Sequence, residues 1–232
     1  MNLSRRLQIV AQAVTPGHRV TDVGTDHGYV PIYLIKNQCC EKAIAMDVNK
    51  GPLERAREHI KSEGLTDQIE TRLSDGLAML SPEETDSVVI AGMGGDLICR
   101  ILGRAPEFFE AKTEFILQPQ SEWFKVRHLL HHNGYHIQNE WFLKEDGKYY
   151  VVMKAKAAED EMFSCLNYPE ETDDMYGRLL IEEKNPVLLE YLNKERDKKK
   201  KIATQIGDKT VRYGELMDEV EQLEKVIEKM KK

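Results

Sequence analysis

The segment most able to do chemistry lies near the start of the chain and reads Asp22-Val23-Gly24-Thr25-Asp26-His27-Gly28. It follows a β-rich run, precedes a helical stretch and has the pattern acid-x-Gly-x-x-x-Gly. Glycine lets the backbone turn sharply and approach a ligand that a Cβ would exclude. Open α/β sheets bind ligands at the carboxyl ends of their strands. The segment therefore predicts a ligand site to which Asp22, Gly24 and Gly28 contribute.

Two more acids follow the next two β-rich runs. Asp47, with Val48 beside it, ends the second run, where a carboxylate can accept hydrogen bonds from both hydroxyls of a ribose. Asp75 and Gly76 follow the third run, where a carboxylate could receive an adenine amino group; capping the next helix is the alternative for Asp75. The Gly-x-Gly-x-x-Gly dinucleotide fingerprint is absent. Since S-adenosylmethionine has no pyrophosphate to cradle, the three acids in this order predict that cofactor.

The fourth and fifth β-rich runs end in two further loops. The loop Ala91-Gly92-Met93-Gly94-Gly95-Asp96 lacks an Asn-Pro-Pro-Tyr type of motif, but it offers bare backbone beside a reactive methyl group. Gly92, Met93 and Gly94 are therefore expected at the cofactor; a tight strand-to-helix turn is the alternative. Gln118, Pro119 and Gln120 are expected at the substrate. An amide there could bind the edge of a base or merely tie down the loop, and the sequence leaves both open.

The first 158 residues alternate short strands with helices, a pattern that implies right-handed βαβ units and a parallel sheet. A final hairpin adds an antiparallel strand at one edge. The expected fold class is α/β, a mostly parallel seven-stranded Rossmann-like domain of the class I methyltransferase type. The expected strands are Arg19–Val23, Lys42–Asp47, Gln68–Leu73, Ser87–Ala91, Glu114–Leu117, Tyr135–Leu143 and Tyr149–Ala155, and the expected helices are Leu3–Val14, Tyr29–Asn37, Pro52–Ser62, a short turn at Leu77–Leu80, Leu97–Leu102 and Phe124–His132.

Residues 159–232 carry no strand pattern and are expected to form a second, helical domain. Apolar residues recur at alternating steps of four and three, the pattern of a coiled-coil seam: Leu216, Val220, Leu223, Ile227 and Met230. An earlier helix over Pro186–Gln205 could fold back on this one across Gly207-Asp208 as a coiled-coil-like hairpin. The seam is short, so packing within the chain is favoured over dimerisation, and a monomer is expected with a weak dimer as the alternative.

The bulk composition narrows the function further. The 232 residues contain 33 lysines and arginines against 40 aspartates and glutamates, a formal net charge of −7, which argues against a general attraction to nucleic acid but allows a local basic patch. The sequence shows no secretory signal and no spanning helix, so no membrane association is expected. The four cysteines lack zinc-ligand spacing, which favours reduced thiols in a cytoplasmic protein without a metal.

Several motifs together resemble one known family. They are Leu3-Ser4-Arg5-Arg6-Leu7, Gly-Thr-Asp-His-Gly-Tyr from Gly24, Ala-Gly-Met-Gly-Gly from Ala91, Leu-Gln-Pro-Gln from Leu117 and Glu-Asp-Gly-Lys-Tyr-Tyr from Glu145. The chain is similar in these motifs to TrmK, the bacterial tRNA (adenine-22-N1)-methyltransferase family. Gly28 is one departure, since some members carry alanine there. The resemblance implies transfer of a methyl group from S-adenosylmethionine to N1 of adenine 22 of tRNA, with S-adenosylhomocysteine as the other product.

The implied reaction suggests roles for the remaining residues. Adenine N1 carries a lone pair, so the enzyme must extrude the base, align N1 with the methyl group and stabilise the positive charge that develops on the ring. Asp26 is the candidate for that charge, His27 could orient it or contact the substrate, and Tyr29 could stack on the base. A helix cap is the alternative for Asp26, and core packing the alternative for Tyr29. Arg5, Arg6 and the run Lys198–Lys201 are candidate phosphate contacts.

Three other functions fit parts of the pattern. A small-molecule methyltransferase would share the cofactor loops but would not need a helical appendage. A non-catalytic adaptor would bind S-adenosylmethionine with the first domain and recruit a partner with the second. An NAD-dependent oxidoreductase is disfavoured by the missing third glycine and by the terminal hairpin.

Overall fold

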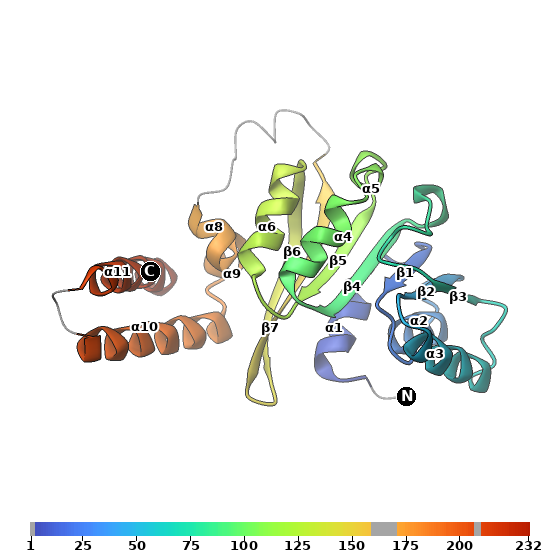
Figure 1. The fold of residues 1–232 in the computed structure, drawn as a ribbon, viewed down its shortest axis with the longest axis horizontal. Coiled ribbons are helices and arrows are strands. Elements are labelled where there is room, and N and C mark those ends of the chain that lie inside the picture. Colours follow the sequence, from blue (N-terminus) through green and yellow to red (C-terminus); the bar gives the residue numbers. More distant parts are fainter. Residues whose placement is uncertain (1–2, 159–170, 207–209) are drawn as a thin grey trace. The chain divides into compact units, whose positions relative to one another are not determined.

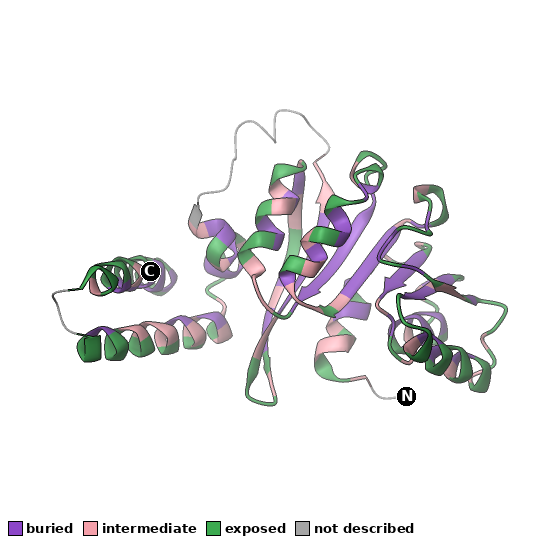
Figure 2. Cartoon of the chain, viewed as in Figure 1, coloured by how far each residue is buried: buried purple, intermediate pink, exposed green. Residues whose placement is uncertain are grey.

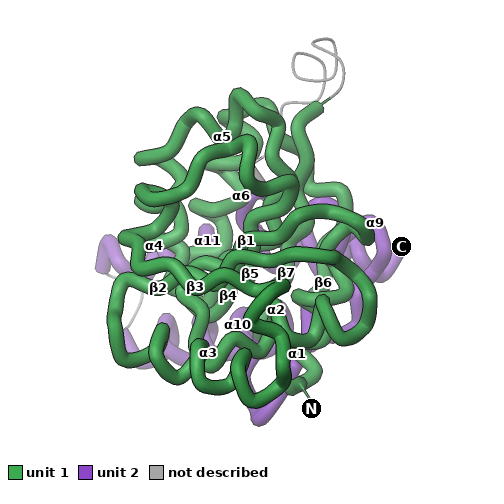
Figure 3. The backbone as a smooth tube through the Cα atoms, turned by 90° about the vertical axis from the view of Figure 1, so that its right-hand side faces the viewer, with its two compact units in different colours: residues 1–141, 150–168 green, residues 142–149, 169–232 purple. Residues whose placement is uncertain are grey.

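The structure is a computed structural model that describes residues 3–158, 171–206 and 210–232. The chain divides into two compact units (Figure 3). The first comprises residues 1–141 and 150–168, and the second comprises residues 142–149 and 169–232. The tip of the terminal hairpin therefore belongs to the second unit. The domain boundary expected after residue 158 adjoins residues 159–170, which lie outside the described residues.

The first unit is built on a seven-stranded sheet in the order β3-β2-β1-β4-β5-β7-β6 (Figure 1). The first five strands pair in parallel, and β7 pairs antiparallel with β5. The order reverses between β1 and β4, and open α/β sheets bind ligands outside the carboxyl ends of the strands at such a point. The strands are β1 (Val20–Val23), β2 (Ala43–Asp47), β3 (Ile69–Leu73), β4 (Ser87–Met93), β5 (Glu114–Pro119), β6 (Tyr135–Glu145) and β7 (Lys148–Ala157).

The sheet is covered on both faces. Helices α1 (Arg5–Ala13), α2 (Tyr29–Lys36) and α3 (Lys50–Ser62) pack on one face, and α4 (Gly95–Gly103) and α6 (Trp123–His132) pack on the other (Figures 1 and 3). The short α5 (Glu107–Glu110) precedes β5. Every residue of β1 and β5 is buried, and Figure 2 shows this core running through the middle of the sheet. Such burial is what the apolar strand runs predict for a parallel sheet.

The expected strands and the longer expected helices are present, with shifts at their ends. The strand β4 runs two residues past the expected end at Ala91, because its pairing with β5 resumes at Met93 after a register shift at Gly92. The helical turn expected at Leu77–Leu80 is a non-helical turn, and a 3-10 helix forms instead at Pro82–Glu84. There Pro82 supplies a backbone angle suited to a helix start, and Ser81 and Glu84 form a capping box.

The second unit contains four helices among its described residues: α8 (Glu171–Tyr176), α9 (Arg178–Glu182), α10 (Pro186–Ile206) and α11 (Val211–Lys231). Helices α10 and α11 pack against each other, and Lys200 forms an ion pair with Glu224 at 2.5 Å between them. The turn expected at Gly207-Asp208 lies outside the described residues. The apolar seam expected in the last helix is buried throughout: Leu216, Val220, Leu223, Ile227 and Met230.

An aromatic cluster joins the hairpin tip to α10 within the second unit. The rings of Tyr149 and Tyr191 meet edge to face with centroids 5.1 Å apart, and Phe142 contacts both. The Tyr149 hydroxyl donates to Glu190 at 2.9 Å, and Lys144 forms an ion pair with the same carboxylate at 2.5 Å. Edge-to-face aromatic contacts and a shared carboxylate fix the hairpin tip on the helix.

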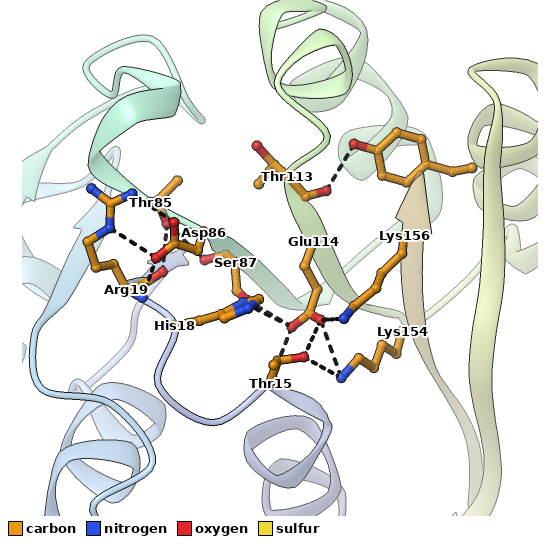
Figure 4. A network of polar contacts seen from close by, with 11 residues as sticks. Thr15, His18, Arg19, Thr85, Asp86, Ser87, Thr113, Glu114, Lys154 and Lys156 are labelled. Atoms are coloured by element: carbon orange, nitrogen blue, oxygen red, sulfur yellow. Dashed lines mark hydrogen bonds and ion pairs between the residues drawn. The ribbon is translucent and has the colours of Figure 1, made fainter. Parts of the chain in front are cut away.

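The amino ends of the strands hold a charged network, centred on the buried carboxylate of Glu114 (Figure 4). This carboxylate accepts hydrogen bonds from the backbone and hydroxyl of Thr15 and from Ser87, and lies 3.3 and 3.2 Å from the ammonium groups of Lys154 and Lys156. A cavity of about 700 Å³ opens beside it. Because most of its charged groups pair with one another and the predicted ligand loops lie at the opposite edge of the sheet, we assign it no function.

Candidate active site

The glycine loop after β1 is anchored to the end of the neighbouring strand. The backbone amides of Gly24 and Thr25 both donate to the carbonyl oxygen of Met46, at 2.8 Å each. Gly24, His27 and Gly28 all have positive φ, of 77°, 62° and 66°. Glycine adopts this region freely, whereas a histidine held there is strained, and such strain clusters at functional sites. The loop is therefore a fixed turn at the carboxyl edge of the sheet, as its pattern predicts.

Asp47 occupies the position expected for a ribose ligand. Its carboxylate is buried, and its Oδ1 accepts a hydrogen bond from the amide of Asn49 at 2.7 Å. Among the described residues none donates to Oδ2. Val48 beside it is 57% exposed, which leaves an apolar side chain facing outward at this edge. A carboxylate next to an exposed apolar side chain suits a ribose and the flat face of an adenine.

Asp22 is the other buried acid of the predicted cofactor site. Burial raises its pKa to about 6, and the charge of Asp47 adds to the effect. A carboxylate destabilised in this way binds a cationic ligand favourably, since the ligand supplies the missing counter-charge. The methionine part of S-adenosylmethionine carries an ammonium and a sulfonium group.

Asp75 and Gly76 follow β3 as expected, in a turn beside α4. The Asp75 carboxylate is largely exposed and lies 3.6 Å from the guanidinium of Arg104. Gly76 has a φ of 61°, and a Cβ there would lie 2.9 Å from Cγ2 of Ile101. Since Asp75 does not cap a helix in the structure, its side chain remains available at the edge of the site.

The loop after β4 brings its glycines against the β1 and β5 loops. A Cβ at Gly24 would overlap the end of the Met93 side chain, so Met93 crosses directly over the first loop. Gly94 caps α4, and a Cβ at Gly95 would lie 2.5 Å from the carbonyl oxygen of Ser121. Gly92 is exposed, with a φ of 82°. These close approaches explain the glycine-rich sequence better than a simple turn does.

Asp26, His27 and Tyr29, expected at the reacting base, lie together. The Asp26 carboxylate is 61% exposed, 3.5 Å from Nε2 of His27 and 2.9 Å from Nη2 of Arg55. The rings of His27 and Tyr29 stack with centroids 5.2 Å apart, and His59 meets the Tyr29 ring edge-on. Tyr29 is 36% exposed, so it is not simply a core residue. Gly28, rather than Asp26, occupies the helix cap position of α2.

The candidate substrate residues separate into buried and exposed sets. The side chain of Gln118 is fully buried and accepts hydrogen bonds from the amide of Gly92 and the guanidinium of Arg6. Pro119 is also buried. Gln120 is exposed, and its backbone N–H donates to the backbone carbonyl oxygen of Met93 at 2.8 Å. Arg5 is exposed. The contacts of Gln118 therefore favour the alternative that it anchors the loop, whereas Gln120 and Arg5 are exposed.

Three residues near the site were missed in the sequence. Arg55 and His59 reach the β1 loop from α3, and their spacing of four residues on one helix face is a signal that could have identified them. Tyr150, on β7, lies under the guanidinium of Arg6 with 5.2 Å to the ring centroid. Tyr150 ends the Glu-Asp-Gly-Lys-Tyr-Tyr motif, but no local pattern shows that its ring meets Arg6, because the two residues are far apart in the sequence.

The fold and this site define a Rossmann-like methyltransferase: the seven strands end in one antiparallel hairpin, and the ligand loops follow β1 to β5 at one edge. The sequence model of TrmK, described as tRNA (adenine(22)-N(1))-methyltransferase, matches residues 20–232. The chain belongs to this family.

The comparisons with individual proteins agree. The tRNA (adenine(22)-N(1))-methyltransferase of Bacillus subtilis is 33% identical over 98% of both chains. The crystal structure of B. subtilis TrmK superposes with a TM-score of 0.88 at 34% identity, over 97% of this chain and 99% of that one. Mycoplasma capricolum TrmK, solved with S-adenosylhomocysteine, superposes with a TM-score of 0.87 at 30% identity, over 98% and 99%. The resemblance expected from the motifs is confirmed.

Proposed function

We propose that this protein transfers a methyl group from S-adenosylmethionine to N1 of adenine 22 in tRNA. The observation that carries the proposal is the match to the TrmK family over residues 20–232, and the turns predicted to bind the cofactor, which follow β1 to β4, support it. A Streptococcus pneumoniae structure in complex with S-adenosyl-L-methionine, 30% identical with a TM-score of 0.86 over 97% of this chain and all of that one, supports the choice of cofactor.

The residues at this edge fit S-adenosylmethionine. Asp47 would hold the ribose, Val48 and Asp75 would meet the adenine, and Asp22 would face the cationic methionine part. The turns at Gly24, Gly28 and Gly76, which all have positive φ, would let the backbone approach the ligand, and Gly92, Met93 and Gly94 would do the same. The bound cofactor supplies an electrophilic methyl group on a sulfonium sulfur.

The chain's own residues then bind and orient the base. Adenine N1 attacks with its lone pair, the bond between sulfur and methyl breaks, and the electron pair of that bond stays on sulfur. The ring gains a positive charge, which the exposed carboxylate of Asp26 would stabilise. The stacked rings of His27 and Tyr29 would offer a flat surface to an extruded base. In this proposal Asp26, His27 and Tyr29 are the catalytic residues.

The tRNA would be held by a local set of cations rather than by overall charge, since the net charge is −7. Arg5 is exposed beside the site and fits that use, and the exposed amide of Gln120 would add an uncharged hydrogen bond. Of the run Lys198–Lys201, Lys199 and Lys200 pair with acids on α11, so their charges are already partly neutralised. Exposed pairs of this kind break at a cost of about 1 kcal/mol or less, so they leave room for a phosphate.

The same proposal covers the second unit and the setting of the enzyme. We infer that α10 and α11 form a coiled-coil-like appendage that packs within one chain, because the seam residues are buried. The protein would then be a monomer, with a weak dimer as the alternative. No helix in the described part of the chain is long and apolar enough to cross a membrane. A tRNA substrate would be met in the cytoplasm.

The test is methyl transfer from labelled S-adenosylmethionine to an unmodified tRNA transcript with adenosine at position 22, followed by nucleoside analysis. Label in 1-methyladenosine is expected, and replacing adenosine 22 by guanosine should abolish it. The variant Asp47→Ala is the matched control, because it should lose cofactor binding while the fold persists. Cofactor binding without label in tRNA would contradict the proposal and favour a small-molecule methyltransferase or an adaptor.

A further inference from the structure

The side chain of Gln118 replaces a missing strand contact in the loop that carries Gly92. The pairing of β4 with β5 shifts register between Ala91 and Met93, so Gly92 falls in a bulge. A bulged residue is left out of the strand ladder. Its amide instead donates to Oε1 of Gln118 at 3.0 Å. The position of Gly92, the exposed backbone beside the predicted methyl group, therefore depends on where this one amide oxygen lies.

Gln118 is in turn held from the other side by Arg6. The guanidinium of Arg6 donates to the same Oε1, while Nε2 of Gln118 donates to the carbonyl oxygen of Pro119 at 3.2 Å. Hydrogen bonds from a charged donor are about twice as strong as neutral ones. Gln118 is 0% exposed, so no solvent competes for its oxygen. Arg6, Gln118 and Gly92 thus form a continuous chain of contacts from α1 to the bulge near the end of β4.

The guanidinium of Arg6 also lies over the ring of Tyr150. The Cζ atom of Arg6 lies 5.2 Å from the centroid of that ring, within the range of a cation–π contact. Arg6 is partly buried here, whereas Arg5, its neighbour in the sequence, is exposed. A guanidinium fixed between a buried amide and an aromatic ring is poorly placed to follow a phosphate. The structure therefore separates the two adjacent arginines that the sequence pattern treats alike.

Arg6 also lies next to the surface that the base would approach. A Cβ built on Gly92 would be 3.7 Å from Nε2 of Gln120 and 4.0 Å from Nη1 of Arg6. The side chains of Arg6 and Gln120 thus both lie close to the exposed backbone of Gly92. A displacement of this backbone would change the space in which the methyl group and the base must align.

We infer that Arg6 is a positioning residue for methyl transfer, which acts through Gln118 to hold the Gly92 bulge, and that, of the two adjacent arginines, only Arg5 is a phosphate contact. The inference rests on the proposed function. It requires that losing Arg6 slows the chemical step while tRNA binding changes little, because misplacement by about 1 Å can lower a rate about a hundredfold.

The first test compares Arg6→Ala with Arg5→Ala under steady-state conditions on the tRNA transcript. Arg6→Ala is expected to lower kcat by about tenfold to a hundredfold, with KM for tRNA and Kd for S-adenosylmethionine within about threefold of wild type. Arg5→Ala is expected to raise KM for tRNA and to reduce the dependence of KM on salt, with kcat unchanged. A mainly KM effect in Arg6→Ala, lost at high salt, would overturn the inference and make Arg6 a phosphate contact.

The second test asks whether the effect passes through Gln118. The double variant Arg6→Ala/Gln118→Leu should lose no more kcat than the worse single variant, because both remove the same chain of contacts. Free guanidinium at millimolar concentration should restore part of the kcat of Arg6→Ala and none of that of Gln118→Leu. Additive losses, or rescue of neither variant, would contradict the proposed chain.

The third test needs no substrate. Hydrogen exchange at the Gly92 amide is expected to be slow in the wild-type protein despite its exposure, and faster by about tenfold or more in Arg6→Ala, in line with a lost charge-assisted bond. Tyr150→Phe keeps the ring and should leave the exchange slow, whereas Tyr150→Ala should increase it. Unchanged exchange in Arg6→Ala would overturn the inference. If the wild-type protein made no 1-methyladenosine but showed this exchange pattern, the proposed function alone would fail.

Discussion

The carboxylate of Asp26 and the guanidinium of Arg55 form an ion pair at 2.9 Å, which links the loop after β1 to α3. Both side chains are largely exposed, at 61% and 47%. Exposed pairs contribute about 1 kcal/mol or less to stability, so this pair has little structural value. The pair instead orients the Asp26 carboxylate, because Arg55 holds it next to His27 at the edge where the base is expected.

We therefore expect Asp26→Asn to be defective in chemistry and sound in structure. The substitution keeps the shape of the side chain and removes the charge that would stabilise the methylated ring, so kcat should fall by about a hundredfold. Isothermal titration with S-adenosylmethionine and thermal unfolding should give values close to wild type. Loss of cofactor binding in Asp26→Asn would show that Asp26 shapes the loop instead of acting in the reaction.

Arg55→Ala should show a weaker form of the same defect, with kcat lowered by about tenfold, because Asp26 keeps its charge but loses its orientation. Arg57 on the same helix pairs with Glu54 three residues away and is the matched control. Arg57→Ala should leave kcat unchanged. Equal effects of the two arginine substitutions would indicate a general loss of positive charge.

The raised pKa of Asp22 predicts how cofactor binding depends on pH. Burial raises this pKa to about 6, so the free protein binds a proton there below that pH. A cationic ligand needs the ionised form. The Kd for S-adenosylmethionine should therefore rise by about tenfold for each pH unit below 6 and be constant above about pH 7. Calorimetry in buffers of different ionisation enthalpy should show release of a proton near pH 6.

The variant Asp22→Asn tests this assignment and has a second consequence. It should bind the cofactor more weakly at pH 7, with a Kd that no longer changes between pH 5 and 7. Because the folded pKa of Asp22 is raised, its contribution to stability is present below the unfolded pKa near 4 and is lost as the pH rises through 6. Asp22→Asn should therefore be more stable than wild type at pH 7 in urea unfolding. An unchanged pH dependence in this variant would move the titration to another group.

The network around Glu114 predicts the opposite pH dependence of stability from that of Asp22, because the pKa of Glu114 is lowered. Burial acts to raise the pKa of Glu114, but hydrogen bonds from Thr15 and Ser87 and the charge of Lys154 outweigh it and lower the pKa to about 2. This stabilisation is present above the unfolded pKa of about 4.5 and is lost as the pH falls toward 2. Glu114→Gln should lower the free energy of unfolding by about 3 kcal/mol at pH 7, since two lysines lose their partner.

Glu84→Gln is the control for Glu114. The pKa of Glu84 is also lowered to about 2, chiefly by the hydrogen bond from Arg72, but the side chain is exposed. Its loss should cost less than about 1 kcal/mol in the same urea titration. Neither substitution should change the Kd for S-adenosylmethionine, because both residues lie away from the carboxyl edge of the sheet. A large effect of Glu114→Gln on cofactor binding would mean that the two edges are coupled.

The strands and the glycine-containing turns that follow them could be predicted from the sequence because their signals are local. A run such as Ser87–Ala91 is apolar whatever surrounds it, and the pattern from Asp22 to Gly28 marks its own turn. A residue that ends or closely follows a parallel strand lies at the carboxyl edge of the sheet. Asp47 and Asp75 could therefore be placed at that edge from the sequence alone. The resemblance to TrmK added the substrate, which no local pattern contains.

What could not be predicted depends on pairing between distant segments. Glu114 begins a buried strand, and its sequence neighbours do not show that Thr15, Lys154 and Lys156 will meet its charge. The end of β4 was placed too early because Gly92 interrupts the apolar run, and only the partner strand shows that pairing resumes at Met93. For the same reason the sequence alone cannot decide whether Gln118 binds a base or anchors the loop. Its buried side chain accepts hydrogen bonds from Arg6 and Gly92, which lie on other elements.

Gly24 gives a last prediction, in which steric and backbone effects can be separated. Gly24→Ala places a side chain at a φ of 77° and against the end of Met93, while Gly64→Ala places one at a φ of 72° with nothing within 4 Å. Both variants should lose about 1 kcal/mol of stability from the strained backbone. Only Gly24→Ala should also lose affinity for S-adenosylmethionine, by about tenfold or more, because Met93 can yield only by moving at the edge where the ligand is expected. Adding Met93→Ala to Gly24→Ala should recover part of that affinity in calorimetry, since it removes the clash and leaves only the strain. If the double variant bound no better than Gly24→Ala, the turn itself, and not the crossing of Met93, would be what the cofactor needs at this glycine.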